Sequence, residues 1–340
     1  MNNVQAPVGR DGQTPQLPRS VFVTGANGFI GRGLLERYQA LGVETRGMDL
    51  HADPARNVVA GDLTQPQAWT SHAEDCELFI NTAAVVSLAA PWLLYREVSV
   101  RGVRNALDVA IAGGAKRFLH YSSVAAMGWD FPDQSDEKAC VMIGPDYRYG
   151  VAKGASEHVV LAAHAAGEID CTIIRPGDVY GPGSRAWISE PYKMAKAGTL
   201  VLPAHGNGVF SPVYVDDLFD GTLLAAGLPQ GCGQIFILSG GAPITCREFF
   251  THHWHWAGRR GAPRTLPIAL ALLLTRLIWS ANRLLQRHDE ACPDAIHMLA
   301  RRGDYSIDKA KNLLGYQPKM SLEEGLRRSE DWLRATGQMT

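Results

Sequence analysis

Hydrophobic and polar positions along the chain indicate short strands separated by helical segments. Strand-like runs occur at 21–23, 41–50, 58–64, 78–84, 117–123 and 171–176, with a further one at 234–239. Between several of them, as at 91–113, the apolar residues follow the helical period. Strands that alternate with helices predict right-handed crossovers. The expected fold is therefore α/β with a doubly wound parallel sheet.

The pattern changes near residue 180. Glycine and proline interrupt the chain at 181–183, and beyond about 240 the sequence is mainly helical. Asp216 or Asp217 is expected to be the N-cap of the helix near 218. We expect a disordered leader over 1–18, a sheet domain over 19–180 with return segments near 212–240, and a smaller, mainly helical lobe formed by 181–211 and 241–340.

Three glycines stand three residues apart directly after the first strand. Gly25 permits a tight turn, Gly28 lets the backbone approach a pyrophosphate, and Gly31 lets the next helix pack on the strand. The first N–H groups of that helix would face the phosphates. In this strand–turn–helix context the spacing predicts a dinucleotide-binding turn of the Rossmann type.

Asp49 ends the second strand, 18 residues after Gly31. A carboxylate at about this offset accepts hydrogen bonds from the adenosine ribose hydroxyls and repels a 2′-phosphate. We therefore expect NAD as cofactor, with NADP disfavoured. A solvent-facing strand end is the alternative interpretation, because Arg46 and Arg56 are near enough in sequence to offset the charge.

Tyr149 and Lys153 are four residues apart in a helical segment, so they share one helix face. A phenol with a pKa of about 10 is a poor acid or base at neutral pH. A neighbouring ammonium stabilises the phenolate, and the same lysine can bond a cofactor ribose. Ser123 ends a strand, where sheet-edge sites assemble, and can bond the substrate oxygen. Together the three residues predict a proton-transfer site, whereas the spacing alone also fits a surface pair.

These motifs resemble the extended short-chain dehydrogenase/reductases, over about residues 20–332. The matching pieces are 24–31, 61–63, 82–84, 121–123, 149–153, 175–177 and 213–217. The resemblance implies that Tyr149 is the catalytic acid/base, Lys153 its partner and ribose ligand, and Ser123 the donor to the substrate oxygen. The resemblance also implies that Asp62 and Leu63 contact the adenine and that Pro176 closes over the nicotinamide. Further dinucleotide contacts are implied for Asn27, Phe29, Ile30, Thr82, Ala83 and Ala84.

Two departures from the family pattern affect the expected chemistry. Ser99 stands where the family usually has an asparagine that props the active-site helix. Val124 and Ala125 stand where the sugar-nucleotide dehydratases carry an Asp-Glu pair. Because β-elimination of water needs such carboxylates, we expect no dehydratase activity.

Three stretches resemble the 3β-hydroxysteroid dehydrogenase branch: 82–86, 175–183, and 305–310 with 314–318. This resemblance implies an oxidoreductase that interconverts a secondary alcohol and a ketone on a hydrophobic small molecule, a sterol or a long-chain β-keto or β-hydroxy acid. A nucleotide-sugar epimerase is the alternative enzyme. A non-catalytic dinucleotide-binding sensor is the alternative of another class, which the intact Ser123, Tyr149 and Lys153 oppose.

The apolar segment 266–287 permits three interpretations. Its apolar run is shorter than the roughly 20 residues that span a bilayer. It could be a core helix or pocket wall, a peripheral membrane contact, or a homodimer face.

Composition and residue spacing bear on nucleic-acid binding, the cellular compartment and metal binding. The net charge of −1 gives no electrostatic footprint for nucleic acid. The six cysteines are scattered without a Cys-x-x-Cys pair, which favours a reducing compartment. His252, His253 and His255 do not share one helix face, so we expect no metal site. The expected location is the cytoplasm, with membrane association as the alternative.

Overall fold

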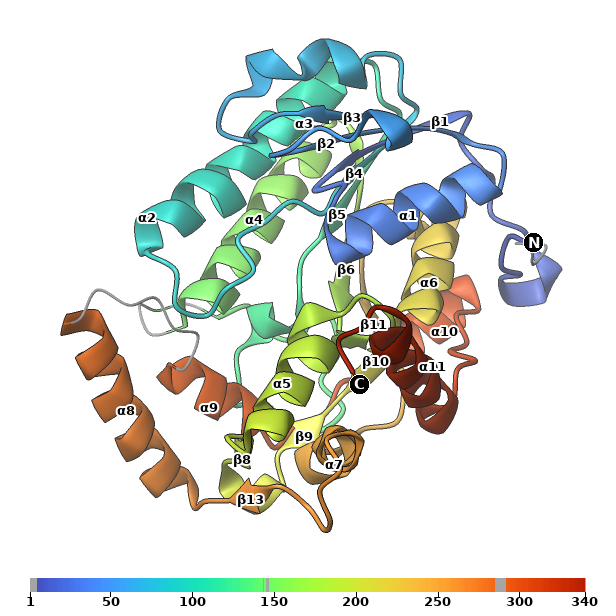
Figure 1. Ribbon diagram of the computed structural model, residues 1–340. Helices are drawn as coiled ribbons and strands as arrows, with labels where there is room; N and C mark the ends of the chain where they lie inside the picture. The colour runs from blue at the N-terminus through green and yellow to red at the C-terminus, as the bar shows by residue number, and fades with distance from the viewer. Residues whose placement is uncertain (1–4, 143, 145–146, 285–291, 340) are drawn as a thin grey trace.

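A seven-stranded sheet forms the centre of the computed structural model, which describes residues 5–142, 144, 147–284 and 292–339 (Figure 1). Every neighbouring pair of its strands is parallel. The strands are, in spatial order, β11 (Gln234–Leu238), β6 (Asp170–Pro176), β5 (Arg117–Tyr121), β4 (Leu78–Asn81), β1 (Ser20–Thr24), β2 (Glu44–Asp49) and β3 (Val58–Ala60). The predicted doubly wound parallel sheet is confirmed, and the strand order reverses between β1 and β4.

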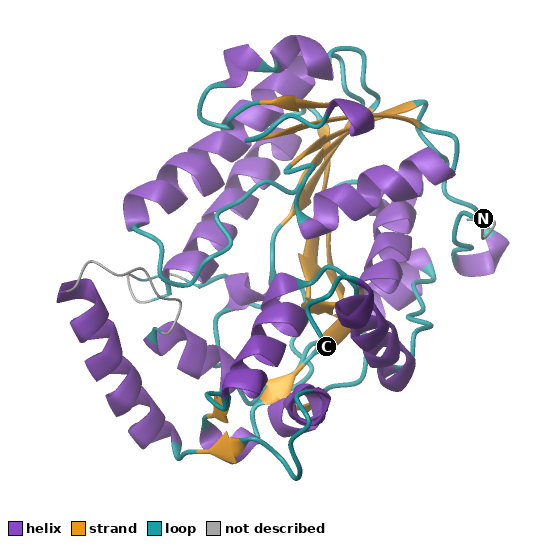
Figure 2. Ribbon diagram, in the orientation of Figure 1, coloured by secondary structure: helices purple, strands orange, loops and turns teal. Residues whose placement is uncertain are grey.

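Helices cover both faces of the sheet (Figure 2). The side chains of the strands alternate between these two faces. Val21, Val23 and Ile80 share a buried cluster with residues of α1 (Phe29–Ala40) and α6 (Val215–Gly227). Phe22, Phe79 and Phe118 belong to a second cluster with residues of α3 (Gly102–Ala112) and α4 (Arg148–Ala165). Because both faces are buried, the middle residues of these strands are apolar on both faces, as in Val21-Phe22-Val23.

The helix expected at 91–113 consists of three consecutive segments. A short α2 (Trp92–Leu94) leads into a π-helical segment, Tyr95–Arg101, which continues as α3. The buried Ser99 lies in the π segment, and its hydroxyl accepts a hydrogen bond from the Val85 N–H at 3.2 Å. The residue that replaces the family's asparagine therefore ties this helix to the loop after β4. Single π turns of this kind often mark functional sites.

The second lobe is mainly helical and is joined by small two-stranded sheets. Its sheets pair β7 (Asp178–Tyr180) with β10 (Pro212–Tyr214), β9 (Val209–Phe210) with β12 (Ile244–Thr245), and β8 (Val201–Leu202) with β13 (Arg264–Thr265). Its helices are α5 (Glu190–Ala197), α7 (Cys246–Trp256), α8 (Ile268–Leu284), α9 (Pro293–Leu299) and α11 (Leu322–Ala335). Among the described residues, no helix combines the length and apolarity that a membrane crossing requires.

The helix α10 (Asp308–Leu314) belongs to the sheet domain by its contacts. The Lys309 ammonium donates to the Ile235 carbonyl of β11 at 2.8 Å. The Tyr316 hydroxyl, just after the helix, donates to the Ser239 carbonyl at 3.1 Å. The lobe expected over 241–340 is therefore interrupted by this return to the sheet.

Two local predictions are wrong. Residues 5–18 do not form a disordered leader: the Gln16 N–H donates to the Gly227 carbonyl at the end of α6 at 3.0 Å, and a 3-10 turn at Arg10–Gly12 lies against α10. Neither Asp216 nor Asp217 is the N-cap of α6, because that position is Tyr214. The Asp217 carboxylate instead accepts from backbone N–H groups at 319 and 320, which fixes the chain before α11.

Candidate active site

The predicted site residues gather at one edge of the sheet. In a parallel sheet the carboxyl ends of the strands meet at the same edge, where α/β proteins bind ligands. Gly25 follows β1, Asp49 ends β2, Asp62 follows β3, Thr82 follows β4, Ser123 follows β5 and Pro176 ends β6. The topology therefore brings these residues together from six strands.

The glycine turn leaves the start of α1 open to a ligand. Gly25 has a φ of +70°, and the Gly28 N–H donates to its carbonyl at 3.0 Å. A Cβ at Gly31 would lie 2.2 Å from the same carbonyl oxygen, so the helix can pack this closely only with glycine there. Gly28 is the N-cap of α1, and no side chain caps the helix; Phe29 and Ile30 are its first residues. The uncapped N–H groups fit the pyrophosphate of a dinucleotide.

Asp49 lies directly against this turn. Its carboxylate accepts from the Asn27 N–H at 2.8 Å and from the Leu50 N–H at 2.7 Å. The Asn27 side-chain oxygen accepts from the Arg56 guanidinium at 3.0 Å. Arg56 is itself paired with Asp53 at 2.6 Å. The charge of Arg56 is therefore offset locally, and Asp49 is placed beside the turn as a ribose ligand requires.

The loops after β3 and β4 complete the predicted cofactor edge. Asp62 accepts from the Thr64 N–H at 2.7 Å, while Leu63 is buried under α3. The Thr82 hydroxyl donates to the Thr24 carbonyl at 2.7 Å, which holds the β4 loop against the glycine turn. The partly exposed residues beside these contacts are Ala83 and Ala84, and the buried end of β6 is Pro176.

Ser123, Tyr149 and Lys153 meet at the start of α4. The Lys153 ammonium lies 6.0 Å from the centroid of the Tyr149 ring and donates to the Tyr121 carbonyl at 2.8 Å. The Ser123 hydroxyl accepts from the Ala125 N–H at 3.1 Å and hydrogen-bonds the Tyr149 side chain. Ser123 is partly exposed, so its hydroxyl is accessible to a ligand.

Burial sets the protonation of this group. It raises the pKa of Tyr149, and the hydrogen bond from Ser123 only partly opposes this. Burial also lowers the pKa of Lys153 to about 8, against the attraction of the Glu157 carboxylate. From the sequence, we expect Lys153 to lower the pKa of the Tyr149 phenol. In this structure the pKa is raised instead, because burial disfavours the charged phenolate.

A buried polar chain below the site was not found from the sequence. The Thr24 hydroxyl donates to the Asn81 side chain at 2.6 Å, and Asn81 contacts His120 Nδ1 at 3.1 Å. His120 Nε2 contacts the Ser156 hydroxyl at 2.9 Å, which donates to the Lys153 carbonyl. Burial keeps the pKa of His120 well below its usual value, so the ring is neutral and can accept at one nitrogen and donate at the other. These hydrogen bonds link β1 to α4, the helix that carries Tyr149 and Lys153.

A buried ion pair adjoins the same helix. Glu157 lies one turn after Lys153, and its carboxylate accepts two hydrogen bonds from the Arg175 guanidinium at 2.8 and 2.7 Å. The Ser122 hydroxyl also donates to Glu157. Ser122 is thus committed to the interior, which leaves Ser123 as the hydroxyl that a substrate can reach.

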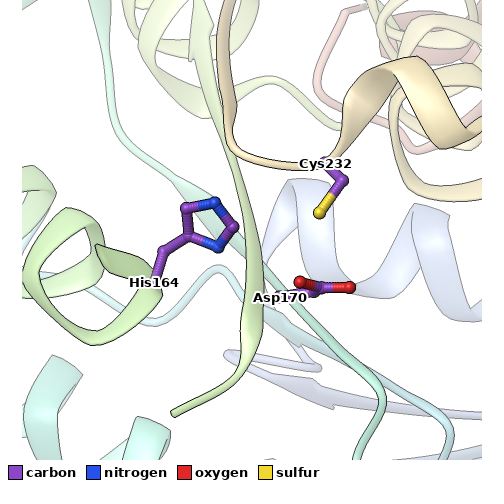
Figure 3. Close-up of side chains that lie close together, drawn as sticks. All are labelled: His164, Asp170 and Cys232. Carbon is purple, nitrogen blue, oxygen red and sulfur yellow. The ribbon is translucent and has the colours of Figure 1, made fainter. Parts of the chain in front are cut away.

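A second cluster of potential ligands lies at the opposite edge of the sheet. The side chains of His164, Asp170 and Cys232 converge at the amino end of β6, with ligand atoms within 4.8 Å of one another (Figure 3). Burial raises the pKa of the Cys232 thiol, Asp170 raises it further, and the Arg117 guanidinium opposes both. Because Arg117 already places a positive charge beside the thiol, the cluster is poorly suited to a metal cation.

Known proteins resemble this chain over nearly its whole length. A 27% identical relative, over 93% of this chain and 96% of its own, is the 4-hydroxy-2-methyl-3-oxo-4-farnesyl-3,4-dihydroquinoline-1-oxide ketoreductase of Stigmatella aurantiaca. The decarboxylating sterol-4-alpha-carboxylate 3-dehydrogenase of Candida albicans is 25% identical over 93% of this chain and 97% of its own. The dTDP-glucose 4,6-dehydratase of Streptomyces venezuelae, solved with NAD bound, has a TM-score of 0.76 at 22% identity, covering 94% and 98%.

The model of the NAD dependent epimerase/dehydratase family matches residues 21–237, which include the glycine turn, Asp49, Ser123 and the start of α4. This match covers more than half of the chain. The cofactor of this family is NAD, and the relatives of this chain include a 3β-hydroxysteroid dehydrogenase. The chain is therefore a member of the NAD dependent epimerase/dehydratase family and an enzyme that acts on CH–OH groups.

Proposed function

We propose that the protein interconverts a secondary alcohol and a ketone on a hydrophobic skeleton, either a sterol or a long-chain β-keto or β-hydroxy acid. The observation that supports this proposal most directly is the apolar environment of the Tyr149 ring. Tyr149 and Val85 both pack against a small apolar cluster of Ala90, Tyr95 and Ala152. A reacting centre beside an apolar wall suits a substrate with little polar surface to desolvate.

The proton transfer follows from the three side chains. Oxidation requires Tyr149 as the phenolate: its oxygen accepts the proton of the substrate hydroxyl and becomes the phenol, while the Ser123 hydroxyl donates to the substrate oxygen. During reduction, Tyr149 returns the proton to that oxygen. The positive charge of Lys153 lies close enough to favour the phenolate once it forms. NAD, when bound along the glycine turn, supplies the hydride acceptor or donor.

The site offers little to a nucleotide-sugar. Val124 and Ala125, which replace the carboxylates of a dehydratase, are buried. The buried Arg301 is committed to Asp178 and to the Val209 carbonyl, so its charge is not free for a diphosphate. The names of the Stigmatella and Candida relatives also describe ketone or alcohol chemistry, on a farnesyl-substituted dihydroquinoline oxide and on a sterol carboxylate. Epimerisation of a nucleotide-sugar is the second candidate, because the family includes such enzymes.

A substrate panel tests the proposal. Purified protein would be assayed with NAD and NADH against a 3β-hydroxysterol, a long-chain β-keto acid and UDP-glucose. We expect cofactor turnover with the sterol or the keto acid and no epimerisation of the sugar. Epimerisation with a higher kcat/KM than any lipid substrate would contradict the proposal.

Tyr149→Phe separates catalysis from binding in that panel. General acid–base catalysis contributes about 10²- to 10⁴-fold, so kcat should fall by that order while NADH still binds. Tyr38→Phe, at a buried tyrosine of α1, is the matched control and should keep its activity. Unchanged turnover in Tyr149→Phe would remove the acid/base role.

A further inference from the structure

The helix α8 presents an apolar stripe outward, at the edge of the molecule in Figure 1. Leu270, Leu273, Leu274, Leu277 and Ile278 are 41%, 55%, 41%, 61% and 50% exposed. These positions recur at i, i+3, i+4, i+7 and i+8, so they lie on one face of the helix. Such a continuous exposed patch marks an interaction surface.

The opposite face of α8 is the one that docks on the protein. Ala271 is 6% exposed, and Leu272, Thr275 and Trp279 are half-buried. The helix contacts α9, which follows it in the chain. One face of α8 is therefore already packed against the protein. The leucine stripe lies on the other face, which the chain itself leaves exposed.

The charge around the stripe has one sign. Residues 249–288 contain six arginines and no aspartate, glutamate or lysine. Within the described part of this segment, Arg264 and Arg276 are exposed. The rest of the chain carries a formal net charge of −7, which these six arginines bring to −1 for the whole chain. Arg264, just before α8, and Arg276, within it, therefore place positive charge on the segment that carries the apolar stripe.

We propose that α8 lies in the surface of a bilayer with anionic headgroups. A helix in the interface buries its apolar face about 5–10 Å deep and keeps its arginines at the headgroups. A two-fold contact between copies through α8 would bring these positive segments together, which opposes self-association there. A bilayer surface matches both the leucines and the arginines.

Contacts connect α8, through α9, to the start of α4, the helix that carries Tyr149 and Lys153. The helix α8 contacts α9, which carries His297. His297 in turn contacts the Tyr147 ring edge-on at 6.0 Å. Tyr147 is the N-cap of α4, two residues before Tyr149. An apolar substrate would therefore enter beside the membrane, a step that rests on the proposed function.

A second exposed apolar group lies near the same end of α4. Val86, Trp92 and Leu93 are 75%, 44% and 59% exposed. The Arg148 guanidinium, in the first turn of α4, contacts the Ala90 carbonyl in this loop at 3.4 Å. The start of the catalytic helix is thus flanked by two sets of outward apolar side chains.

Vesicle flotation tests the contact without any substrate. The full chain would be floated with phosphatidylcholine vesicles, with and without about 30% phosphatidylglycerol. We expect flotation with the anionic vesicles, weaker flotation with neutral ones, and loss of binding as salt rises. The double variant Leu273→Glu/Leu277→Glu should lower the bound fraction roughly tenfold or more, because it places two charges in the stripe.

Leu313→Glu is the matched control. Leu313 is 38% exposed on α10, and its variant should float like the wild type. Circular dichroism and NADH binding should be unchanged in the double variant. The proposal is overturned if the wild type does not float with anionic vesicles, or if the double variant floats equally well. It is also overturned if light scattering shows a dimer that only the double variant dissociates, since a second copy would then cover the stripe. None of these readouts depends on turnover.

Discussion

A Cβ atom at Gly150 would lie 2.3 Å from the carbonyl oxygen of Ala125. Gly150 follows Tyr149 in α4, and Ala125 lies in the 3-10 turn that Ser123 caps. The close approach of helix and turn is what allows Ser123 to bond Tyr149. Gly150, between Tyr149 and Lys153, is therefore a geometric requirement of the candidate site.

Gly150→Ala should separate Tyr149 from Ser123. The new methyl group must push α4 from the turn, because a carbonyl cannot be approached at 2.3 Å. We expect kcat to fall roughly tenfold or more, since misplacement of a catalytic group by about 1 Å has effects of this order. Gly154→Ala is the control on the same helix, because its Cβ meets only the Val141 side chain, at 3.1 Å. Steady-state kinetics of both variants would decide, and equal kcat values would contradict the argument.

The two neighbouring serines should behave differently. Ser123→Ala removes the hydroxyl that bonds Tyr149, so kcat should fall about 10- to 100-fold with little change in stability. Ser122→Ala removes a buried hydrogen bond to Glu157, so the free energy of unfolding should fall by about 1 kcal/mol while turnover persists. Urea denaturation and kinetics on both variants measure these effects. The reverse pattern would assign the catalytic hydroxyl to Ser122.

The cofactor turn could be predicted from the sequence because its constraints are local. Gly25, Gly28 and Gly31 act within seven residues of chain, and a strand and a helix frame them. The same holds for Tyr149 and Lys153, which one helical turn brings together. Period and spacing are sufficient where the structure is set by neighbours in the chain.

The support of the site could not be predicted, because its partners are far apart in sequence. Asn81 and His120 come from different strands, and Glu157 meets Arg175 from the next strand. The spacing of residues along the sequence does not predict such pairs, because they depend on the order of the strands in the sheet. Asp217 illustrates the opposite error: it has the composition of an N-cap, but backbone N–H groups near residue 319 hold its carboxylate instead.

Removing the buried ammonium of Lys153 should stabilise the fold. Its pKa is about 8 in the folded chain and 10.5 as the ordinary value, so at neutral pH the folded state carries a cost of roughly 3 kcal/mol. The lost hydrogen bond to Tyr121 offsets about 1 kcal/mol of this in Lys153→Met. We therefore expect the variant to be more stable at pH 7, measured by urea denaturation, although it should be nearly inactive.

The difference in stability between the wild type and Lys153→Met should depend on pH. Below a pH of about 8, Lys153 is protonated in both states and the cost is complete. Between about 8 and 10.5 the unfolded chain binds more protons, so the wild type gains stability as pH rises, and the advantage of Lys153→Met should shrink. The exposed Lys196→Met is the control and should show no such trend. A difference that is constant with pH would rule out a buried, titrating Lys153.

Asp49→Asn should weaken the preference for NAD over NADP. The amide keeps an oxygen for the Asn27 N–H but loses the charge that repels a 2′-phosphate. Arg56, which contacts the Asn27 side chain, then lies beside the turn without a facing carboxylate at position 49. We expect the ratio of kcat/KM for NAD to that for NADP to fall roughly tenfold or more. Glu44→Gln, at the other end of β2, removes the same charge away from the cofactor edge and should leave the ratio unchanged. A wild type that already prefers NADP, or a variant with an unchanged ratio, would show that Asp49 only holds the turn.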